Sequence, residues 1–302
     1  MAPQVTVVLE LHCTLGEGTV WCERTQRLLW TDIERSLLHA LTPGPGVGRH
    51  RQWAMPDRVG SFALTAEPDR LLLGLAGGVA LFDLASGTLG PLQPVEADEP
   101  RTRINDGHAD RQGRFVFGTF NQQGHEAVGH FWRVDGRGAD AARPLPLERL
   151  PLPAIAVANG TAFSPDGTKM FFTDSPTRTL WCVDYAAGGP LGTPRIFARI
   201  AAADGFPDGA CVDADGGLWV TLWDGGMLLR FDAGGRETDR IALPARRPTC
   251  PAFGGPELAT LYLSTACVGL DAALAAEPGQ GALLAVTGTG RRGLAEPRFV
   301  VG

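Results

Sequence analysis

The chain has 302 residues, of which 44% are hydrophobic and 20% are charged, and its formal net charge is −6. This balance is typical of a globular protein and excludes intrinsic disorder as the main state. The mildly acidic charge, without a block of Lys or Arg, gives no reason to expect nucleic-acid binding. The 40 glycines and 23 prolines show no G-X-Y period, so they indicate many tight turns rather than collagen.

The N-terminal sequence MAPQVTVVLELHC has no basic region followed by a long apolar run, so it does not resemble a secretory signal. No run approaches the roughly 18 apolar residues that a transmembrane helix needs. None of the six cysteines forms a CxxC pair, and we expect them to be reduced. We therefore expect a cytoplasmic protein that binds neither membranes nor nucleic acid and is a monomer or a weak homo-oligomer.

A repeated theme runs through the chain: a turn with Asp and Gly, a strand, a second turn and another strand. Its clearest copy, NGTAFSPDGTKMFFTDSPTRTLWCVDYAAG, spans residues 159–188. The six copies begin, in chain order, at Glu17, Ser61, Asn105, Asn159, Asp208 and Cys250. The intervals of 44, 44, 54, 49 and 42 residues suit four short strands, which is the content of one propeller blade.

The segments inside the copies have strand character, because they are rich in aromatic and β-branched residues. Examples are RFVFGTF (114–120), MFFTD (170–174), LWVTLW (218–223) and LYLST (261–265). Turns with Asp-Gly chemistry separate them, and no window shows a long helical stripe with caps. The pattern predicts an all-β, six-bladed β-propeller with four antiparallel strands per blade, forming a single domain over residues 1–302.

Three segments fall outside the repeat. Residues 5–10, VTVVLE, precede the first copy, and we expect this N-terminal strand to close the ring beside 282–286 or 298–301, which buries two open sheet edges. The Pro-rich residues 138–154 are expected to form a surface loop between blades. Residues 269–279, GLDAALAAEPG, are expected to form one short helical turn in a loop.

Three copies begin with an oxygen donor that is followed by glycine: Glu17, Asn159 and Asp208. Taken singly, Asn-Gly and Asp-Gly pairs are usually only turns, but here they share one position in the repeat. In a propeller, the side chain at the start of each innermost strand points into the mouth of the central channel. Two carboxylates and an amide oxygen suit one divalent metal ion, with Ca, Mg and Mn preferred and Zn or Fe(II) tolerated.

The chain resembles the regucalcin, gluconolactonase and sugar-lactonase family, also called the senescence-marker-protein family. The matching stretches occur in the family's order and cover nearly the whole chain. They are LGEGTVW (15–21), RINDGHADRQGRFVFGT (103–119), NGTAFSPDGTKMFFTDS (159–175), PDGACVDADGGLWV (207–220) and FGGPELATLYLSTA (253–266).

The resemblance implies a six-bladed propeller whose metal ligands are Glu17, Asn159 and Asp208. It also implies that Arg103 and Asn105 bind hydroxyl groups of a small sugar lactone. In some members a Glu shortly after the GT motif also touches the substrate. This chain reads FNQQGHE there, with Gln123 at the nearest position, so the hydroxyl contact and the sugar preference differ from that pattern.

The implied reaction is hydrolysis of an aldonolactone, with the metal polarising the lactone carbonyl and activating water. Asp208 is the candidate catalytic base if its second oxygen is free, and Asp106 is the alternative. Calcium binding without catalysis, phosphotriester or aryl-ester hydrolysis, and a plain interaction scaffold are the competing functions. No GxSxG motif supports a serine hydrolase.

A few other side chains are open to two interpretations. His108 and His125 flank the proposed site in the sequence and are either ordinary surface residues or part of its wall. Cys250 opens the last copy and is expected to be a small buried hydrophobic residue rather than a channel group. Trp223 either packs between blades or forms an apolar wall against a sugar ring.

Overall fold

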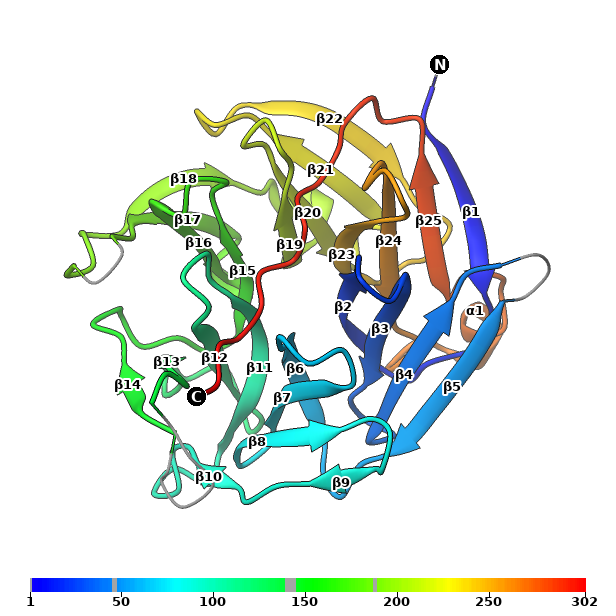
Figure 1. Cartoon of the computed structure of the whole chain (residues 1–302). Coiled ribbons are helices and arrows are strands. Elements are labelled where there is room, and N and C mark those ends of the chain that lie inside the picture. Colours follow the sequence, from blue (N-terminus) through cyan, green and yellow to red (C-terminus); the bar gives the residue numbers. More distant parts are fainter. Residues whose placement is uncertain (1, 45–47, 139–144, 187–188) are drawn as a thin grey trace.

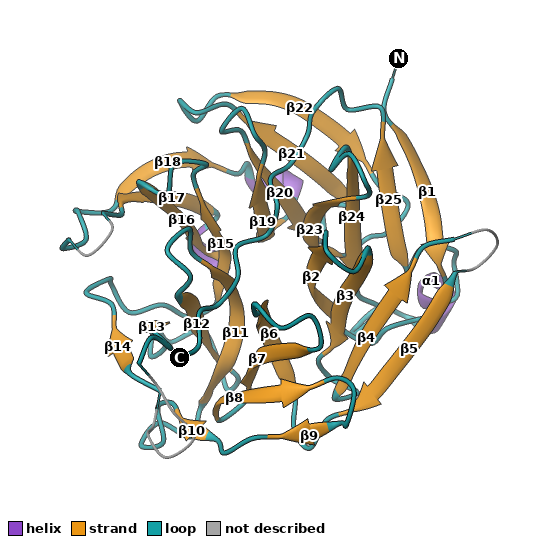
Figure 2. Cartoon of the chain, in the orientation of Figure 1, coloured by secondary structure: helices purple, strands orange, loops and turns teal. Residues whose placement is uncertain are grey.

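The computed structural model describes residues 2–44, 48–138, 145–186 and 189–302. Six antiparallel β-sheets are arranged in a ring around a central channel (Figure 1). Strands dominate the ring and loops connect them at both mouths, and the described part of the chain contains three short helical segments (Figure 2). The predicted all-β, six-bladed propeller is therefore confirmed.

In each blade the strands follow one another outward from the channel. Blade one consists of β2 (Gly16–Cys22), β3 (Arg27–Asp32), β4 (Leu37–Thr42) and β5 (Arg49–Ala54). Blade two has β6 (Val59–Leu64), β7 (Arg70–Leu75) and β8 (Gly78–Asp83), with β9 (Thr88–Leu89) and β10 (Gln93–Pro94) both pairing with β8. Blade three has β11 (Thr102–Ala109), β12 (Phe115–Asn121), β13 (Phe131–Val134) and β14 (Leu147–Arg149).

The second half of the chain continues the same order. Blade four contains β15 (Ala158–Phe163), β16 (Lys169–Asp174), β17 (Thr179–Asp184) and β18 (Arg195–Arg199). Blade five contains β19 (Phe206–Val212), β20 (Leu218–Trp223), β21 (Met227–Phe231) and β22 (Glu237–Ala242). Blade six contains β23 (Pro248–Gly254), β24 (Thr260–Thr265) and β25 (Leu283–Thr287). The helical segments are η1 (Ser175–Thr177), η2 (Ala202–Asp204) and α1 (Ala272–Ala275).

The N-terminal strand closes the ring, as expected from its sequence. Strand β1 (Gln4–Leu9) pairs antiparallel with β25, with Val5 opposite Val286, and so becomes the outer strand of blade six. Because blade six then contains the first and the last strand of the chain, opening the ring requires breaking this ladder. The alternative partner, residues 298–301, lies elsewhere.

Two expectations about the connections have different outcomes. The helical turn within 269–279 is confirmed as α1, and no helix in the described chain is long and apolar enough to cross a bilayer. The loop prediction for 138–154 is wrong at Leu147–Arg149, which form β14, and residues 139–144 lie outside the described part. No proline falls between Pro146 and Pro151, so this stretch can pair at the edge of the sheet.

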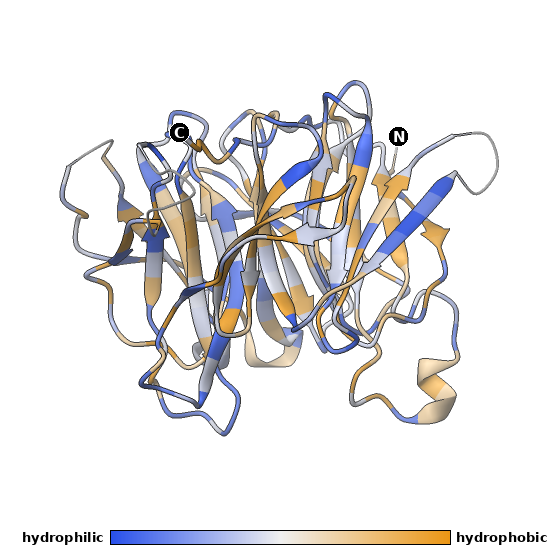
Figure 3. Cartoon of the chain, turned by 60° about the horizontal axis from the view of Figure 1, so that its bottom comes forward, coloured by the Kyte–Doolittle hydropathy of each residue, from blue (hydrophilic) through white to orange (hydrophobic). Residues whose placement is uncertain are grey.

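The hydrophobic core lies between neighbouring blades. One cluster joins Leu29 and Leu38 of blade one to Phe62 and Leu73 of blade two, and the other blade pairs are packed in the same way. Hydrophobic residues colour the strands inside the blades in Figure 3, whereas most loops are hydrophilic. Because the hydrophobic core lies between the blades, the mouth of the central channel can carry polar side chains.

Every innermost strand contains an irregularity at a corresponding position. The register with the second strand shifts between Glu17 and Val20, between Asn159 and Ala162, and at the equivalent points of the other four blades. Such a β-bulge bends the strand and re-aims a side chain. Gly18 and Gly160 take φ angles of 59° and 63°, which favour glycine. The bulges therefore direct the residue before each glycine toward the channel.

The C-terminal segment crosses the channel at the mouth where the first and second strands of each blade are joined (Figure 1). Its backbone hydrogen-bonds to blades five, two and three, through Ala214, Leu64 and Gly113. Phe299 of this segment is fully buried in the core between blades two and three. The segment therefore ties non-adjacent blades together and covers one mouth.

We expect Phe299→Ala to lower the free energy of unfolding by about 3–5 kcal/mol, because it leaves a cavity in a closed core. The matched change Val300→Ala, at a side chain that is 38% exposed, should cost less than about 0.5 kcal/mol. Urea denaturation followed by circular dichroism measures both. Equal losses in the two variants would contradict the anchoring role of Phe299.

Candidate active site

A cavity of about 440 Å³ opens at the channel mouth where the innermost strands begin. Glu17, Asn159 and Asp208, which come from blades one, four and five, all line it. Arg103 and Asn105 of blade three line the same cavity. Residues separated by up to 191 positions in the chain thus share one site, because each innermost strand starts at this mouth (208 minus 17).

The two carboxylates of this set are strongly perturbed. Burial, and after it the Asp106 carboxylate, raise the pKa of Glu17 to about 8, against the opposing effects of a hydrogen bond from Gly18 and the charge of Arg103. Burial and the charges of Glu17 and Asp106 raise the pKa of Asp208 well above its usual range. In the described part of the chain, no Lys or Arg donates a hydrogen bond to either carboxylate, so a cation between them would relieve the repulsion.

Hydrogen bonds fix the orientation of the Asn159 side-chain amide. Asn159 Nδ2 donates to Ser175 Oγ over 2.9 Å, and Asn159 Oδ1 accepts from Asn105 Nδ2 over 3.0 Å. Asn105 Nδ2 also donates to the carbonyl of Ala158 over 2.8 Å. The amide oxygen of Asn159 therefore faces the cavity and retains a second lone pair for another partner.

Glu17, Asn159 and Asp208 fit a hard divalent cation by their chemistry, since two oxygens are anionic and one is a neutral carbonyl. In the described ranges no three or more His, Cys, Asp or Glu side chains gather into a metal site. Glu17, Asn159 and Asp208 do not form such a cluster, because Asn159 contributes an amide rather than a His, Cys, Asp or Glu side chain.

Arg103 is the cation of the site. Its side chain is buried, its Nη1 donates to Ile104 O at 2.9 Å and to Asn105 Oδ1 at 2.8 Å, and the guanidinium stacks on the Phe120 ring. Burial, and after it the charge of Arg58, lower the pKa of Arg103 to about 10, so the group stays charged at neutral pH. Its Nε is buried and has no hydrogen-bond partner among the described protein atoms.

The loop after β12 differs in detail from the sequence-based expectation. Gln123 is exposed and is not part of the cavity wall, and its backbone N–H donates to Asn121 Oδ1 over 3.0 Å. Gln122 and His125 line the cavity instead. One position along an irregular loop decides which side chain faces inward, and motif spacing alone does not reveal it.

Asp106 is buried in the channel but is not part of the cavity wall. Its Oδ2 accepts the backbone N–H of Thr161 over 2.6 Å, and burial raises its pKa. Cys250 is also buried and lies outside the cavity wall, its Sγ 4.0 Å from the Thr19 carbonyl. Of the two candidate bases, Asp208 is thus the one that lines the cavity.

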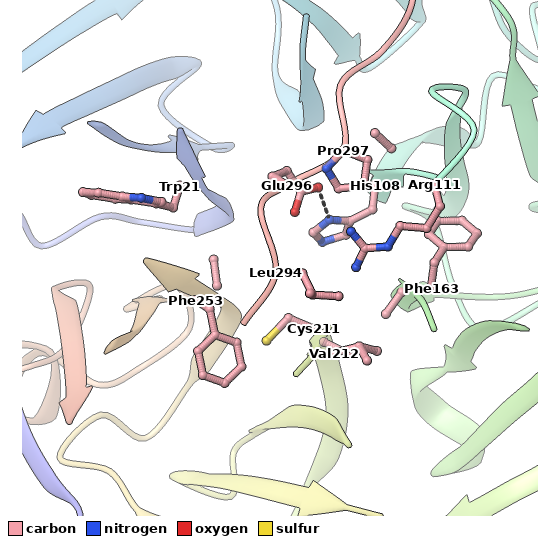
Figure 4. A pocket seen from close by; sticks show the side chains of 14 residues that line it. Trp21, His108, Arg111, Phe163, Cys211, Val212, Phe253, Leu294, Glu296 and Pro297 are labelled. Atoms are coloured by element: carbon pink, nitrogen blue, oxygen red, sulfur yellow. Dashed lines mark hydrogen bonds and ion pairs between the residues drawn. The ribbon is translucent and has the colours of Figure 1, made fainter. Parts of the chain in front are cut away.

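A second cavity of about 40 Å³ lies under the C-terminal segment at the other mouth (Figure 4). His108 lies here, and its Nδ1 is 3.2 Å from Glu296 Oε1. Cys211 and Phe253 complete part of the wall. This volume suits a few water molecules rather than a sugar. His108 is therefore separated from the cavity that holds the two carboxylates, whereas His125 belongs to it.

Sequence reasoning missed several wall residues. Ser175 was not among the candidate residues, yet its hydroxyl accepts from the Asn159 amide and it lines the cavity. Phe206 carried no motif signal, although it stands two residues before Asp208 and lines the cavity with Trp223. The position of Phe206 at the start of an innermost strand, just before the Asp-Gly pair, was the available signal.

The raised pKa of Glu17 gives a pH dependence with a definite sign. Between its ordinary pKa of 4.5 and about 8, the folded metal-free protein binds more protons at Glu17 than the unfolded chain, so this group's contribution to stability falls as pH rises. A metal ion needs the deprotonated carboxylate, so its affinity should weaken by up to about tenfold per pH unit below pH 8.

We therefore expect Mn²⁺ to raise the melting temperature more at pH 8.5 than at pH 6 in differential scanning calorimetry. In Glu17→Gln one of the two titrating carboxylates is absent and Asp208 remains, so the difference between the two pH values should become smaller. A metal-induced rise that is the same at both pH values in the wild-type protein would contradict the assignment.

Comparison with known proteins agrees with this geometry. Residues 15–267 match the SMP-30/Gluconolactonase/LRE-like region family. An L-arabinolactonase of Azospirillum brasilense is 45% identical, over 99% of this chain and 96% of that protein. A 6-deoxy-6-sulfogluconolactonase of Pseudomonas putida is 36% identical, over 97% of each chain.

Among solved structures, the calcium-binding protein regucalcin of Agrobacterium tumefaciens superposes with a TM-score of 0.89 at 29% identity, over 98% of this chain and 97% of the other. A luciferin-regenerating enzyme superposes with a TM-score of 0.86 at 26% identity, over 99% and 100%. The propeller, the cavity at its mouth and these matches lead to one conclusion: the chain belongs to the SMP-30/gluconolactonase/LRE-like family.

Proposed function

We propose that this protein hydrolyses a sugar lactone to the aldonic acid, using one divalent metal ion held by Glu17, Asn159 and Asp208. The observation that carries the proposal is the meeting of these three side chains with Arg103 and Asn105 around one cavity. The lactonases among its relatives support the reaction class. A cavity of about 440 Å³ is of the size that takes a small molecule such as a monosaccharide lactone.

A bound divalent ion supplies a Lewis acid for the lactone carbonyl and lowers the pKa of water. Glu17, Asn159 and Asp208 would hold it, and three protein ligands leave room for water and substrate. Ca, Zn, Mn, Mg and Fe(II) all remain candidates, since oxygen ligands select among them mainly by cavity size and availability.

Asp208 is the proposed catalytic base. Its carboxylate lines the cavity, and it accepts a proton as water attacks the carbonyl carbon. The bond between this carbon and the ring oxygen then breaks, and the ring oxygen takes up a proton to become a hydroxyl group. Asp106 is less suited, because Thr161 N–H already occupies one oxygen and the side chain lies outside the cavity wall.

Arg103 and Asn105 are the proposed substrate-binding residues. Arg103 is held by the carbonyl of Ile104 and by Asn105 Oδ1, so its remaining N–H groups have a fixed direction toward substrate oxygens. The third residue proposed from the resemblance, Gln123, is replaced in this role by Gln122 and His125, which line the cavity.

Calcium binding without catalysis is the second candidate, and the regucalcin structure among the similar proteins favours it. The buried arginine beside the carboxylates favours hydrolysis, because a site that only binds a cation gains nothing from a neighbouring positive charge.

All six cysteines are free thiols, which supports the proposed cytoplasmic location.

We expect the metal-loaded protein to release acid from a neutral aldonolactone, and Asp208→Asn to reduce kcat by at least about 100-fold. Asp215→Asn, an exposed turn residue paired with Arg291, should keep the wild-type rate. Acid release in a pH-stat with each candidate metal restored measures both. Tight calcium binding without hydrolysis of any lactone in a panel would instead establish the second candidate.

Arg103→Lys should raise KM for the same lactone about tenfold or more, because a lysine cannot reproduce the fixed fork of donors. Arg70→Lys, at the partly exposed start of β7 and outside the cavity wall, is the matched control and should leave KM unchanged. Unaltered KM in Arg103→Lys would show that this arginine does not bind the substrate.

A further inference from the structure

We propose that Phe206 and Trp223 form an aromatic platform for the C–H face of a neutral sugar ring, and that Arg178 and Arg247 are positioning residues for this platform. The proposal rests on the lactone site described above and specifies which lactones it accepts. In this proposal both arginines stack on the aromatic rings and do not bind the substrate.

The two aromatic residues are direct neighbours across blade five. Phe206 begins β19 and Trp223 ends β20, and the two face each other in the register of this strand pair. Both line the cavity, together with Pro176 and Pro207. This side of the cavity is therefore apolar over adjacent residues, and an aromatic face packs well against the C–H groups of a sugar.

An arginine from blade four holds Phe206. The Arg178 guanidinium lies 3.9 Å from the centroid of the Phe206 ring, and its Nε donates to the Gly205 carbonyl over 3.1 Å. Gly205 has a φ of 100°, and a Cβ there would come within 2.4 Å of the Trp223 carbonyl. The backbone before Phe206 is thus packed tightly against that of Trp223, which fixes the pair.

An arginine from the segment before blade six holds Trp223 in the same way. The Arg247 guanidinium lies 4.8 Å from the Trp223 ring centroid, and its Nε donates to Asp224 Oδ1 over 2.7 Å. Its Nη1 donates to the carbonyl of Val268. Both arginines therefore have hydrogen-bond partners in the protein while stacking on their rings, an arrangement that limits the motion of the platform.

The residues proposed to bind the substrate hydroxyl groups lie on the far side of blade four from Phe206 and Trp223. Arg103, Asn105 and Gln122 belong to blade three, and Asn159 of blade four stands between the two walls. A sugar lactone has hydroxyl groups at its edge and C–H groups on its face. The two walls match these two parts of the ring.

The charge of the wall indicates a neutral substrate. Arg103 is the only Lys or Arg in the described wall of the cavity, and Arg178 and Arg247 are not part of that wall. In the proposed function Arg103 is occupied by the hydroxyl groups of the sugar, so a phosphate or sulfonate would meet the apolar platform or the Glu17 and Asp208 carboxylates. An anionic substituent therefore loses its hydration without gaining a free cationic partner.

The first test compares substrates and variants of the metal-loaded protein. Wild-type kcat/KM should be at least 100-fold higher for a neutral aldonolactone than for its terminal phosphate ester. Trp223→Leu should raise KM for the neutral lactone at least tenfold while kcat changes less than threefold. Arg247→Met should raise KM several-fold, and Arg247→Lys should restore part of the loss because it keeps a cation near the ring.

The matched control is Arg51→Met. Arg51 stacks on Trp53 at 4.9 Å in β5, on the outer edge of blade one and away from the cavity, so its loss should leave both constants unchanged. Equal turnover of the neutral lactone and the phosphate ester, or an unchanged KM in Trp223→Leu, would overturn the proposal.

A binding measurement separates this proposal from the proposed reaction. Isothermal titration with a neutral aldonolactam, which resembles the lactone but resists hydrolysis, should give at least tenfold weaker binding in Trp223→Leu than in the wild-type protein. This weakening would support the platform even if no lactone were hydrolysed. Unchanged affinity for the lactam in Trp223→Leu would overturn it whatever the hydrolytic activity.

Discussion

Asp208 is buried and Glu17 is partly buried at one mouth of the channel, where little water is available to screen their charges from each other. Burial and mutual repulsion both disfavour ionisation, which is why their pKa values rise. A divalent cation reverses this balance, because it attracts both carboxylates in a region of low dielectric constant. A bound cation would therefore favour the ionised form of both carboxylates at neutral pH, and the proposed chemistry depends on that form.

The propeller produces this arrangement by repetition. Each blade begins with an innermost strand that contains a bulge at an equivalent position, and all six strands start at the same mouth. Blade packing and the β1–β25 ladder keep the ring closed, so the donors approach one another without local contacts in the sequence. The C-terminal segment covers the opposite mouth, where a cavity of about 40 Å³ lies beneath it. The fold therefore leaves one large entrance to the carboxylates.

Much of the fold and of the candidate site could be predicted from the sequence, because both follow from the position of each residue within the repeat. The spacing of the copies gave six blades, and the shared position of Glu17, Asn159 and Asp208 placed them at one mouth, as found. Loop conformation was not accessible in this way, so Gln123 was chosen where Gln122 and His125 line the cavity. Strand β14 was missed because prolines on both sides suggested a loop. The contacts of Arg178 with Phe206 and of Arg247 with Trp223 join different repeats, and no single repeat carries them.

The most direct measurement is anomalous diffraction from a crystal of this protein soaked in Mn²⁺. The account predicts one strong peak at the channel mouth, within about 2.0–2.6 Å of oxygen atoms from Glu17, Asn159 and Asp208. The same crystal form of Asp208→Asn should show a much weaker peak or none. A wild-type crystal without a peak at these three residues, or with manganese bound only elsewhere, would contradict the account.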